Sequence, residues 1–352
     1  MTELPDAPGP ETAATPYFTV ILTAYNRRTY LPRAIGSVLA QSFPRSGYEV
    51  IVVKNFDDEA SDRLIREHGL VGLFRTETAL GIHLKAALDR ARGEVVAFLN
   101  DDDLWEPGKL ERVAELFRSR PSLGFHATSY SVIDEDDRPA SKASDRFSGL
   151  ERFAGREGRS FSAGPASSPE ELARFVEANP GSDSTISLRT AILRRFSSDL
   201  EVLPSSVDTF LLTCGLLSGS DLLIEYVPLT RLRVHRENMS RATDQSFRSY
   251  LEKYARTMTG FAAARRQMVR MAESAGNPWL RDRWASKARN LDHFSGMARG
   301  DLGRRDAFRS LQVELASRPI QRGLAASSML YLASPSVCRA VNFLVGRRIA
   351  GG

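Results

Sequence analysis

The stretch GEVVAFLNDDDLWEPGKL, residues 93–110, places three consecutive aspartates at the end of an apolar run. Residues 95–99 have the composition of a buried strand, and Asp101, Asp102 and Asp103 follow directly. Adjacent carboxylates repel one another, so such a turn is stable only when water solvates it or a cation lies among its side chains. Taken alone, this stretch is either a solvated acidic turn or a site for a divalent cation.

Strand and helix patterns alternate on both sides of the acidic turn. Short apolar runs at 18–23, 48–56 and 72–76 predict strands. Helical spacing at 31–39, through Leu64, Ile65 and His68, and at 80–93 predicts the helices between them. Alternation of this kind over about 85 residues predicts an α/β fold with a doubly wound, mainly parallel sheet.

Polar residues gather where the predicted strands end. They are Tyr25, Asn26 and Arg27 after the first strand, Lys54 and Asn55 after the second, and the three aspartates after the strand at 95–99. Sheets of this class bind ligands outside the carboxyl ends of their strands. The convergence therefore favours Mg²⁺ or Mn²⁺ joining carboxylate oxygens to a diphosphate over a solvated turn.

Length and composition limit the class of protein. The chain has 352 residues, of which 42% are hydrophobic, so we expect one or two globular domains. Cys214 and Cys338 are the only cysteines, which argues against a disulfide framework or a zinc site and favours a reducing, cytoplasmic setting. Residues 1–15 are rich in Pro, Ala and Thr without an apolar core, so we expect a disordered tail rather than a signal peptide.

The charge is unevenly distributed along the chain. Residues 241–352 contain 20 Lys and Arg against 8 Asp and Glu, whereas the whole chain has a net charge of +5. We expect a main, acidic domain at 16–240, and a basic α-helical region at 241–352, because aromatic and aliphatic residues recur in the latter at helical spacing. The arginines are spread along the helices without a groove-reading motif, so nucleic acid is not an expected partner.

Three quoted segments carry a resemblance to a known family. The chain resembles the family 2 glycosyltransferases of the GT-A fold in three segments, which follow one another in the family's order. They are VILTAYNRRTYLPRAIGSVLAQS, YEVIVV and LDRARGEVVAFLNDDDLWEPGKLERV. The resemblance extends from about residue 18 to about residue 240. It implies a Rossmann-like catalytic domain, a requirement for Mn²⁺ or Mg²⁺, a UDP-, GDP- or dTDP-linked sugar donor, and inverting transfer to a glycan or lipid-linked acceptor.

The resemblance also implies roles for individual residues. Those expected to contact the donor nucleotide or its diphosphate are Thr23, Ala24, Tyr25, Asn26, Arg27, Asn55, Lys85, Asp101 and Arg233. Asp102 is the expected metal ligand, and His235 in LTRLRVHRENMS is expected to contact the metal or the diphosphate. Asp103 is assigned to the metal site, with support of the turn, contact with the sugar, or a helix N-terminal charge as alternatives.

Asp208 is the expected catalytic base. In the family, a carboxylate ahead of a helix deprotonates the acceptor hydroxyl, and Asp208 stands at the matching place before apolar residues 210–212. Val207 replaces the usual acidic neighbour. The alternative interpretation is an N-terminal helix residue that serves only the helix dipole, and the two roles are compatible.

Some positions depart from the family pattern. The family usually has aspartate, asparagine and aspartate at the positions of Lys54, Lys85 and Asn100. Lys85 is better explained as a solvated helix residue than as a phosphate contact. A catalytically inactive protein that binds nucleotide sugars or glycans is therefore the alternative function. A nucleotidyltransferase is disfavoured, because no glycine-rich phosphate loop with a lysine follows the first strand.

Two further segments suggest contacts with the acceptor. Residues 134–182 are polar with little periodicity before Pro169, so we expect a flexible acceptor loop, with plain disorder as the alternative. The basic, partly apolar end from residue 327 suggests peripheral contact with an anionic membrane, such as the inner face of the plasma membrane, or a docked terminal helix.

Overall fold

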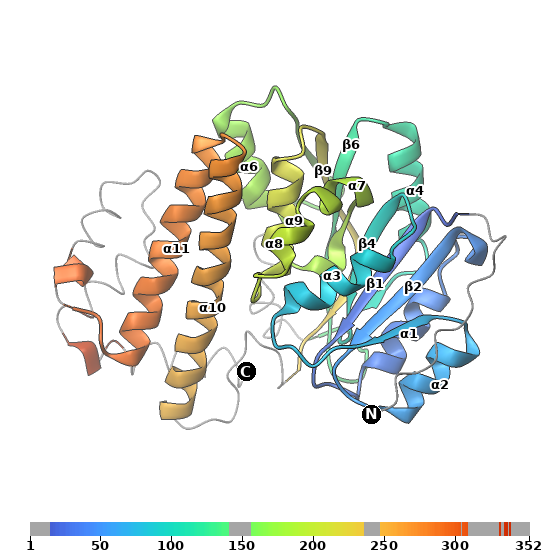
Figure 1. Cartoon of the computed structure of the whole chain (residues 1–352), viewed down its shortest axis with the longest axis horizontal. Helices are drawn as coiled ribbons and strands as arrows, with labels where there is room; N and C mark the ends of the chain where they lie inside the picture. The colour runs from blue at the N-terminus through green and yellow to red at the C-terminus, as the bar shows by residue number, and fades with distance from the viewer. Residues whose placement is uncertain are drawn as a thin grey trace.

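A computed structural model describes residues 15–140, 156–235, 247–303 and 305–308, together with a few positions between 331 and 338. Figure 1 shows a sheet covered by helices, with two long helices beside it. The predicted N-terminal tail at 1–15 and the terminal segment from residue 327 lie almost wholly outside the described residues.

The first half of the sheet is parallel. Strand β1 (Phe18–Ala24) lies between β2 (Tyr48–Lys54) and β4 (Val95–Asn100), and β3 (Val71–Phe74) pairs with β2 at the edge. Alternate residues of these strands enter two different hydrophobic clusters, one on each face of the sheet. Burial on both faces explains why the strands are continuous apolar runs and could be predicted from the sequence.

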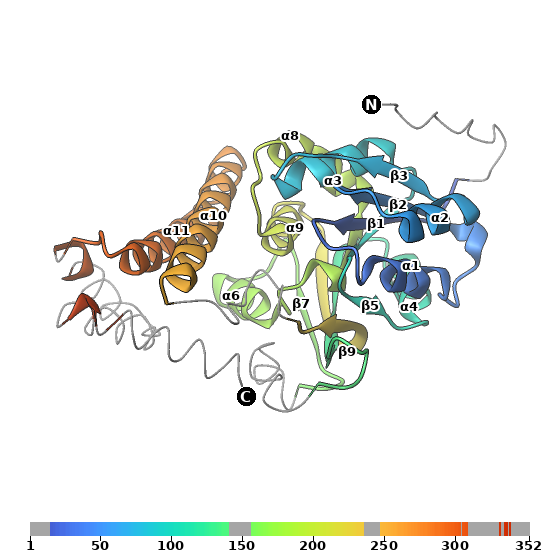
Figure 2. The ribbon, with the colours of Figure 1, turned by 90° about the horizontal axis from the view of Figure 1, so that it is seen from below.

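Four helices cover this half of the sheet, as Figure 2 shows from below. They are α1 (Leu31–Leu39), α2 (Glu59–Glu67), α3 (Leu80–Arg90) and α4 (Lys109–Ser119). Pro32 lies in the first turn of α1, and the Asp58 side chain caps α2 by accepting a hydrogen bond from the Ser61 N–H. Helices α1 and α4 pack into one hydrophobic cluster and α3 into the other, so the sheet is covered on both faces.

The second half of the sheet is mixed. Strand β8 (Ile186–Arg189) is antiparallel to both β4 and β6 (Leu123–Ile133), and β6 runs parallel to the long strand β9 (Asp221–Arg233). Two short strands, β5 (Leu104–Trp105) and β7 (Ser160–Ala163), are antiparallel to β9. The expected doubly wound parallel arrangement therefore holds for residues 18–100, and the remaining strands extend it as a mixed sheet.

Part of the segment predicted to be a flexible loop has regular structure. Strand β7 lies within it, and α6 (Pro169–Ala178) begins at a capping box in which Ser168 and Glu171 bond each other's backbone N–H groups. Residues 141–155 of this segment lie outside the described residues.

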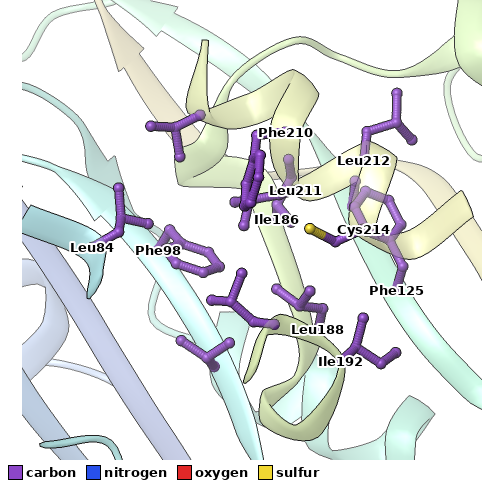
Figure 3. Close-up of a cluster of buried hydrophobic side chains, with 14 of the residues drawn as sticks. Leu84, Phe98, Phe125, Ile186, Leu188, Ile192, Phe210, Leu211, Leu212 and Cys214 are labelled. Carbon is purple, nitrogen blue, oxygen red and sulfur yellow. The ribbon is translucent and has the colours of Figure 1, made fainter. Parts of the chain in front are cut away.

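Several short elements complete the fold. They are η1 (Arg45–Gly47) before β2, η3 (Asp183–Thr185) before β8, and α7 (Thr190–Arg195), α8 (Ser197–Leu200) and α9 (Val207–Leu216) after it. Figure 3 shows α9 side chains Phe210, Leu211 and Leu212 in the buried cluster with Ile186 and Leu188 of β8. Because α9 is apolar on nearly all sides, its N-terminus is held firmly against the sheet.

The C-terminal region is helical, as the sequence predicts. Helices α10 (Phe247–Ser274) and α11 (Pro278–Arg299) lie side by side in Figures 1 and 2, and Asn277 caps the second by accepting from the Leu280 N–H. Buried side chains of both helices, Met268 and Trp284 among them, join the main hydrophobic cluster. None of the helices in the described ranges combines the length and the apolar character that a membrane span needs.

Candidate active site

The acidic turn lies at the carboxyl ends of β1 and β4. The Asp101 N–H donates to the Thr23 carbonyl at 3.1 Å, and the Tyr25 N–H donates to the Asp101 carboxylate. Asp101, Asp102 and Asp103 are only 1%, 7% and 3% exposed, which excludes a solvated acidic turn. Buried carboxylates require positive or hydrogen-bonding partners, and the structure supplies both.

Arg27 provides the nearest positive charge. Its guanidinium lies 2.5 Å from Asp101 Oδ1 and also pairs with Asp102 Oδ2. Burial by itself would lower the pKa of Arg27, but Asp102 and Asp101 outweigh this effect and raise it. Arg27, predicted to contact the diphosphate, thus fills the space between two carboxylates.

His235 provides a second partner for the same carboxylate. Its Nε2 lies 3.1 Å from Asp102 Oδ2, and its ring packs against that of Tyr30, with 4.9 Å between centroids. Burial would raise the pKa of Asp102, yet His235 and Arg27 hold it below its ordinary value. Asp102 is therefore an ionised carboxylate beside an imidazole nitrogen, although Asp102 and His235 are 133 residues apart in the chain.

Asp103 and Arg233 hold the turn together. Asp103 accepts from the Ser184 hydroxyl at 2.6 Å and from the Arg233 N–H at 3.0 Å. The fully buried Arg233 guanidinium donates to the Asp102 carbonyl at 2.9 Å and pairs with Asp137. Both residues, predicted to contact ligands, therefore bind protein groups that fix the turn.

The loop after β1 has a specific backbone shape. Asn26 adopts a left-handed conformation with φ of 57°, and its N–H donates to Asn55 Oδ1 at 2.8 Å. Asn55 Nδ2 donates back to Asn26 Oδ1 at 2.7 Å, so the ends of β1 and β2 are joined at the surface. Lys85 instead pairs with Asp89 on its own helix at 2.7 Å, as expected of a solvated helix residue.

Asp208 lies in the first turn of α9, as predicted. Ser206, ahead of the helix, is left-handed with φ of 59°, and the Thr209 hydroxyl donates to Asp208 Oδ2 at 3.2 Å. Burial raises the pKa of Asp208, while Arg265 of α10 opposes the rise. A half-buried carboxylate with a raised pKa is a suitable proton acceptor near neutral pH.

Asp183 is a site residue that the sequence analysis missed. It accepts from Asn100 Nδ2 at 2.6 Å, and burial together with the charge of Asp208 raises its pKa to about 6. The Trp105 indole and the Lys109 ammonium both donate to the Ser184 carbonyl and so anchor η3. The available signal was Asn100, because an amide in place of the family's aspartate suggests a carboxylate partner.

The side chains at the acidic turn can be compared with the ligands that the predicted metal ion needs. Among the residues that the structure describes, no three His, Cys, Asp or Glu side chains are grouped to hold a metal ion by themselves. Asp102 and His235 nevertheless present one oxygen and one nitrogen side by side at the strand ends. Mg²⁺ typically takes one or two protein ligands and completes its shell with phosphate oxygens and water, so these residues fit a metal that binds together with a diphosphate.

Comparisons with known proteins agree with this geometry. Residues 19–167 match glycosyl transferase family 2. An uncharacterized glycosyltransferase of Nostoc sp. is 34% identical over 132 residues, which are 36% of this chain and 40% of that protein. TuaG of Bacillus subtilis, whose name places it in teichuronic acid biosynthesis, is 31% identical over 133 residues, 36% of this chain and 52% of that protein.

A solved structure shares the fold over nearly the whole chain. The crystal structure of S. aureus TarS residues 1–349 in complex with UDP-GlcNAc has a TM-score of 0.51 and 15% identity, and covers 89% of this chain and 90% of that one. The chain spans about half or less of the two curated relatives. The resemblance to glycosyltransferase family 2 is thus confirmed over residues 19–167, and the α/β architecture is the GT-A fold predicted from the sequence.

Proposed function

We propose that the protein is a metal-dependent, inverting glycosyltransferase that moves a sugar from a nucleoside diphosphate donor to a hydroxyl of a glycan or lipid-linked acceptor. The single observation that carries the proposal is the buried acidic turn, in which Asp102 and His235 converge at 3.1 Å beside the ends of β1 and β4. Parallel α/β sheets bind ligands at this edge.

The loop after β1 is suited to the nucleotide. Tyr25 and Asn26 lie at the surface, and the mutual hydrogen bonds of Asn26 and Asn55 hold the ends of β1 and β2 in one orientation. We expect the base to lie against this loop, the ribose or diphosphate to contact Asp101, and the cation to bind Asp102 and His235. Such a cation, when bound, offsets the charge on the departing nucleoside diphosphate. Because Asp103 already accepts two protein hydrogen bonds, we assign it to supporting the turn.

Asp208 is the proposed base. Inverting transfer in one step needs a carboxylate that removes the acceptor hydroxyl proton while the oxygen attacks the anomeric carbon. The proton passes to an Asp208 carboxylate oxygen, the new C–O bond forms, and the bond to the diphosphate oxygen breaks. A raised pKa matches this task, because the carboxylate is more basic than an exposed one.

Two substitutions and one control test the assignment. Asp208→Asn should lower kcat by about 10² to 10⁴-fold while sparing donor affinity, because it removes only the base. Asp102→Asn should abolish turnover and remove the stabilisation that Mn²⁺ gives in the presence of donor. Asp282→Asn, on the exposed face of α11, should behave as the wild type.

The measurement begins with a thermal-shift screen of UDP-, GDP- and dTDP-sugars, each with Mn²⁺ or with EDTA, because a bound donor stabilises the fold by mass action. Turnover with the selected donor follows. Wild-type rates in Asp102→Asn or Asp208→Asn would refute the assignment. Donor binding without turnover on any acceptor would favour the inactive binding protein instead.

A peripheral membrane contact of the C-terminal segment stays a prediction, and so does a cytoplasmic location at the inner face of the plasma membrane. The segment from residue 327 contains Arg339, Arg347 and Arg348 among apolar residues. Co-sedimentation with anionic vesicles should be lost when residues 327–352 are removed. Equal sedimentation of the two proteins would exclude this contact.

A further inference from the structure

Helix α10 reaches the N-terminus of α9 through one arginine. Arg265 Nη2 donates a hydrogen bond to Thr209 Oγ1 at 2.9 Å, and the same hydroxyl donates to Asp208 Oδ2 at 3.2 Å. A threonine hydroxyl has one proton and two lone pairs, so it accepts from the guanidinium and donates to the carboxylate at the same time. A continuous chain of hydrogen bonds therefore runs from the helical region to the proposed base.

The arginine is fixed by its surroundings. Its guanidinium lies over the ring of Trp284 on α11, 5.3 Å from the centroid, and Trp284 is only 3% exposed. Two residues further along α10, the Gln267 side chain donates to Asp199 Oδ1. These contacts hold α10 against the segment that leads into α9, so the Arg265 charge keeps a defined position relative to Asp208.

Two charged groups from other elements face Asp208 in the described part of the chain. Asp183 of η3 lies close enough that the charge of Asp208 raises its pKa, and Arg265 of α10 is a cation that favours ionisation of Asp208. The charge of Asp208 also acts on Arg265, where it opposes the lowering of the pKa that burial causes. Arg265 is therefore the cation that opposes burial in setting the ionisation of the base.

We propose that Arg265, acting through Thr209, positions the Asp208 carboxylate and keeps it ionised, so that the C-terminal helical region is part of the active site rather than an appendage. The inference rests on the proposed role of Asp208 as the base. Arg265 is a positioning residue in this scheme, because it touches Thr209 and not the substrate.

The first test is the pH profile of turnover in the full chain. Arg265→Gln should lower kcat by about 10- to 100-fold, because a displaced base loses much of its effect, while donor KM changes by less than about twofold. Loss of the cation should raise the pKa of Asp208, so the acidic limb of the kcat/KM profile should move to higher pH. Arg265→Lys, which keeps the charge, should restore most of this limb.

Matched variants separate this role from plain packing. Arg266→Gln changes the next residue of the same helix, whose side chain is 47% exposed and pairs with Asp292, and it should leave the profile unchanged. Thr209→Val removes the intermediate hydroxyl with little change of shape and should move the acidic limb as Arg265→Gln does. Thr209→Ser keeps the hydroxyl, so its acidic limb should stay at the wild-type pH.

A second measurement does not depend on turnover. Carboxyl ¹³C chemical shifts of labelled aspartates, with the Asp208 signal assigned by its loss in Asp208→Asn, should show a higher Asp208 pKa in Arg265→Gln and Thr209→Val than in the wild type. An unchanged Asp208 titration in both variants would overturn the proposal, whether or not the wild type transfers sugar. An active wild type whose rate and profile survive in both variants would overturn it as well. Absence of any transferase activity in the wild type would count against the proposed function alone.

Discussion

Replacing Asp183 by Asn should stabilise the protein at neutral pH. Asp183 has a pKa of about 6 in the folded chain, because of burial and the nearby charge of Asp208, against an ordinary value of 3.8. Asparagine is neutral and keeps the Oδ1 atom that accepts from Asn100 Nδ2 at 2.6 Å. The substitution therefore removes the buried charge and retains the hydrogen bond.

The magnitude follows from proton linkage. Between about pH 4 and about pH 6 the folded chain holds a proton on Asp183 that the unfolded chain has released, so wild-type stability falls as the pH rises through this window. The difference between the folded and unfolded pKa of Asp183 corresponds to about 3 kcal/mol at most. We therefore expect the free energy of unfolding of Asp183→Asn to exceed that of the wild type by about 2 to 3 kcal/mol at pH 7. Near pH 4 the two proteins should be almost equally stable.

The assay is urea unfolding monitored by tryptophan fluorescence, with EDTA and without nucleotide, at several pH values from 4 to 8. Other carboxylates titrate in both proteins, so the difference between wild type and variant isolates the contribution of Asp183. Asp282→Asn serves as the surface control. A difference that does not vary with pH, or a variant that is less stable at pH 7, would refute the reasoning about burial and charge.

Two other predictions concern the surroundings of the site. Asn100→Asp should lower the free energy of unfolding at pH 7 by about 1 to 3 kcal/mol, because a donor becomes a like charge facing Asp183; urea unfolding should show the loss largely relieved when Asp183→Asn is added. Gly93→Ala should lower the melting temperature strongly or prevent folding, because the new Cβ would lie 2.3 Å from the Thr19 nitrogen. Thermal unfolding should show no such loss for Gly36→Ala in α1, where nothing lies within 4 Å of the new Cβ.

The parallel half of the fold could be predicted because its signals are local. Strands β1, β2 and β4 are buried on both faces and therefore appear as uninterrupted apolar runs, and parallel strands bring their carboxyl ends to one edge. This was enough to place the residues after each strand in one region. The mixed half was not predicted, since β7 and β8 are short, lie next to polar segments and pair with strands distant in the sequence.

The missed parts of the site depend on distant contacts. Asn100 and Asp183 are 83 residues apart, and Thr209 and Arg265 are 56 residues apart. Helical spacing in α10 indicates which face is apolar but does not identify the residue that a given arginine contacts. The ion pairs of Arg27 with Asp101 and Asp102 could not be predicted for a related reason, because they join residues more than 70 positions apart, and its contact with the donor stays a prediction.

The charged groups near the proposed base come from segments that are far apart in the sequence. Asp183 is held by Asn100 at the end of β4, so its negative charge is tied to the acidic turn, whereas the opposing charge of Arg265 comes from α10. A protein cut after residue 240 would keep the sheet, the acidic turn and Asp208 but lose Arg265. Asp208 would then lack the nearby cation, and Thr209 would lose the hydrogen bond that Arg265 donates to it. Composition places the boundary between the catalytic domain and the helical region at residue 240. The site that we propose uses residues on both sides of it, Asp208 before and Arg265 after.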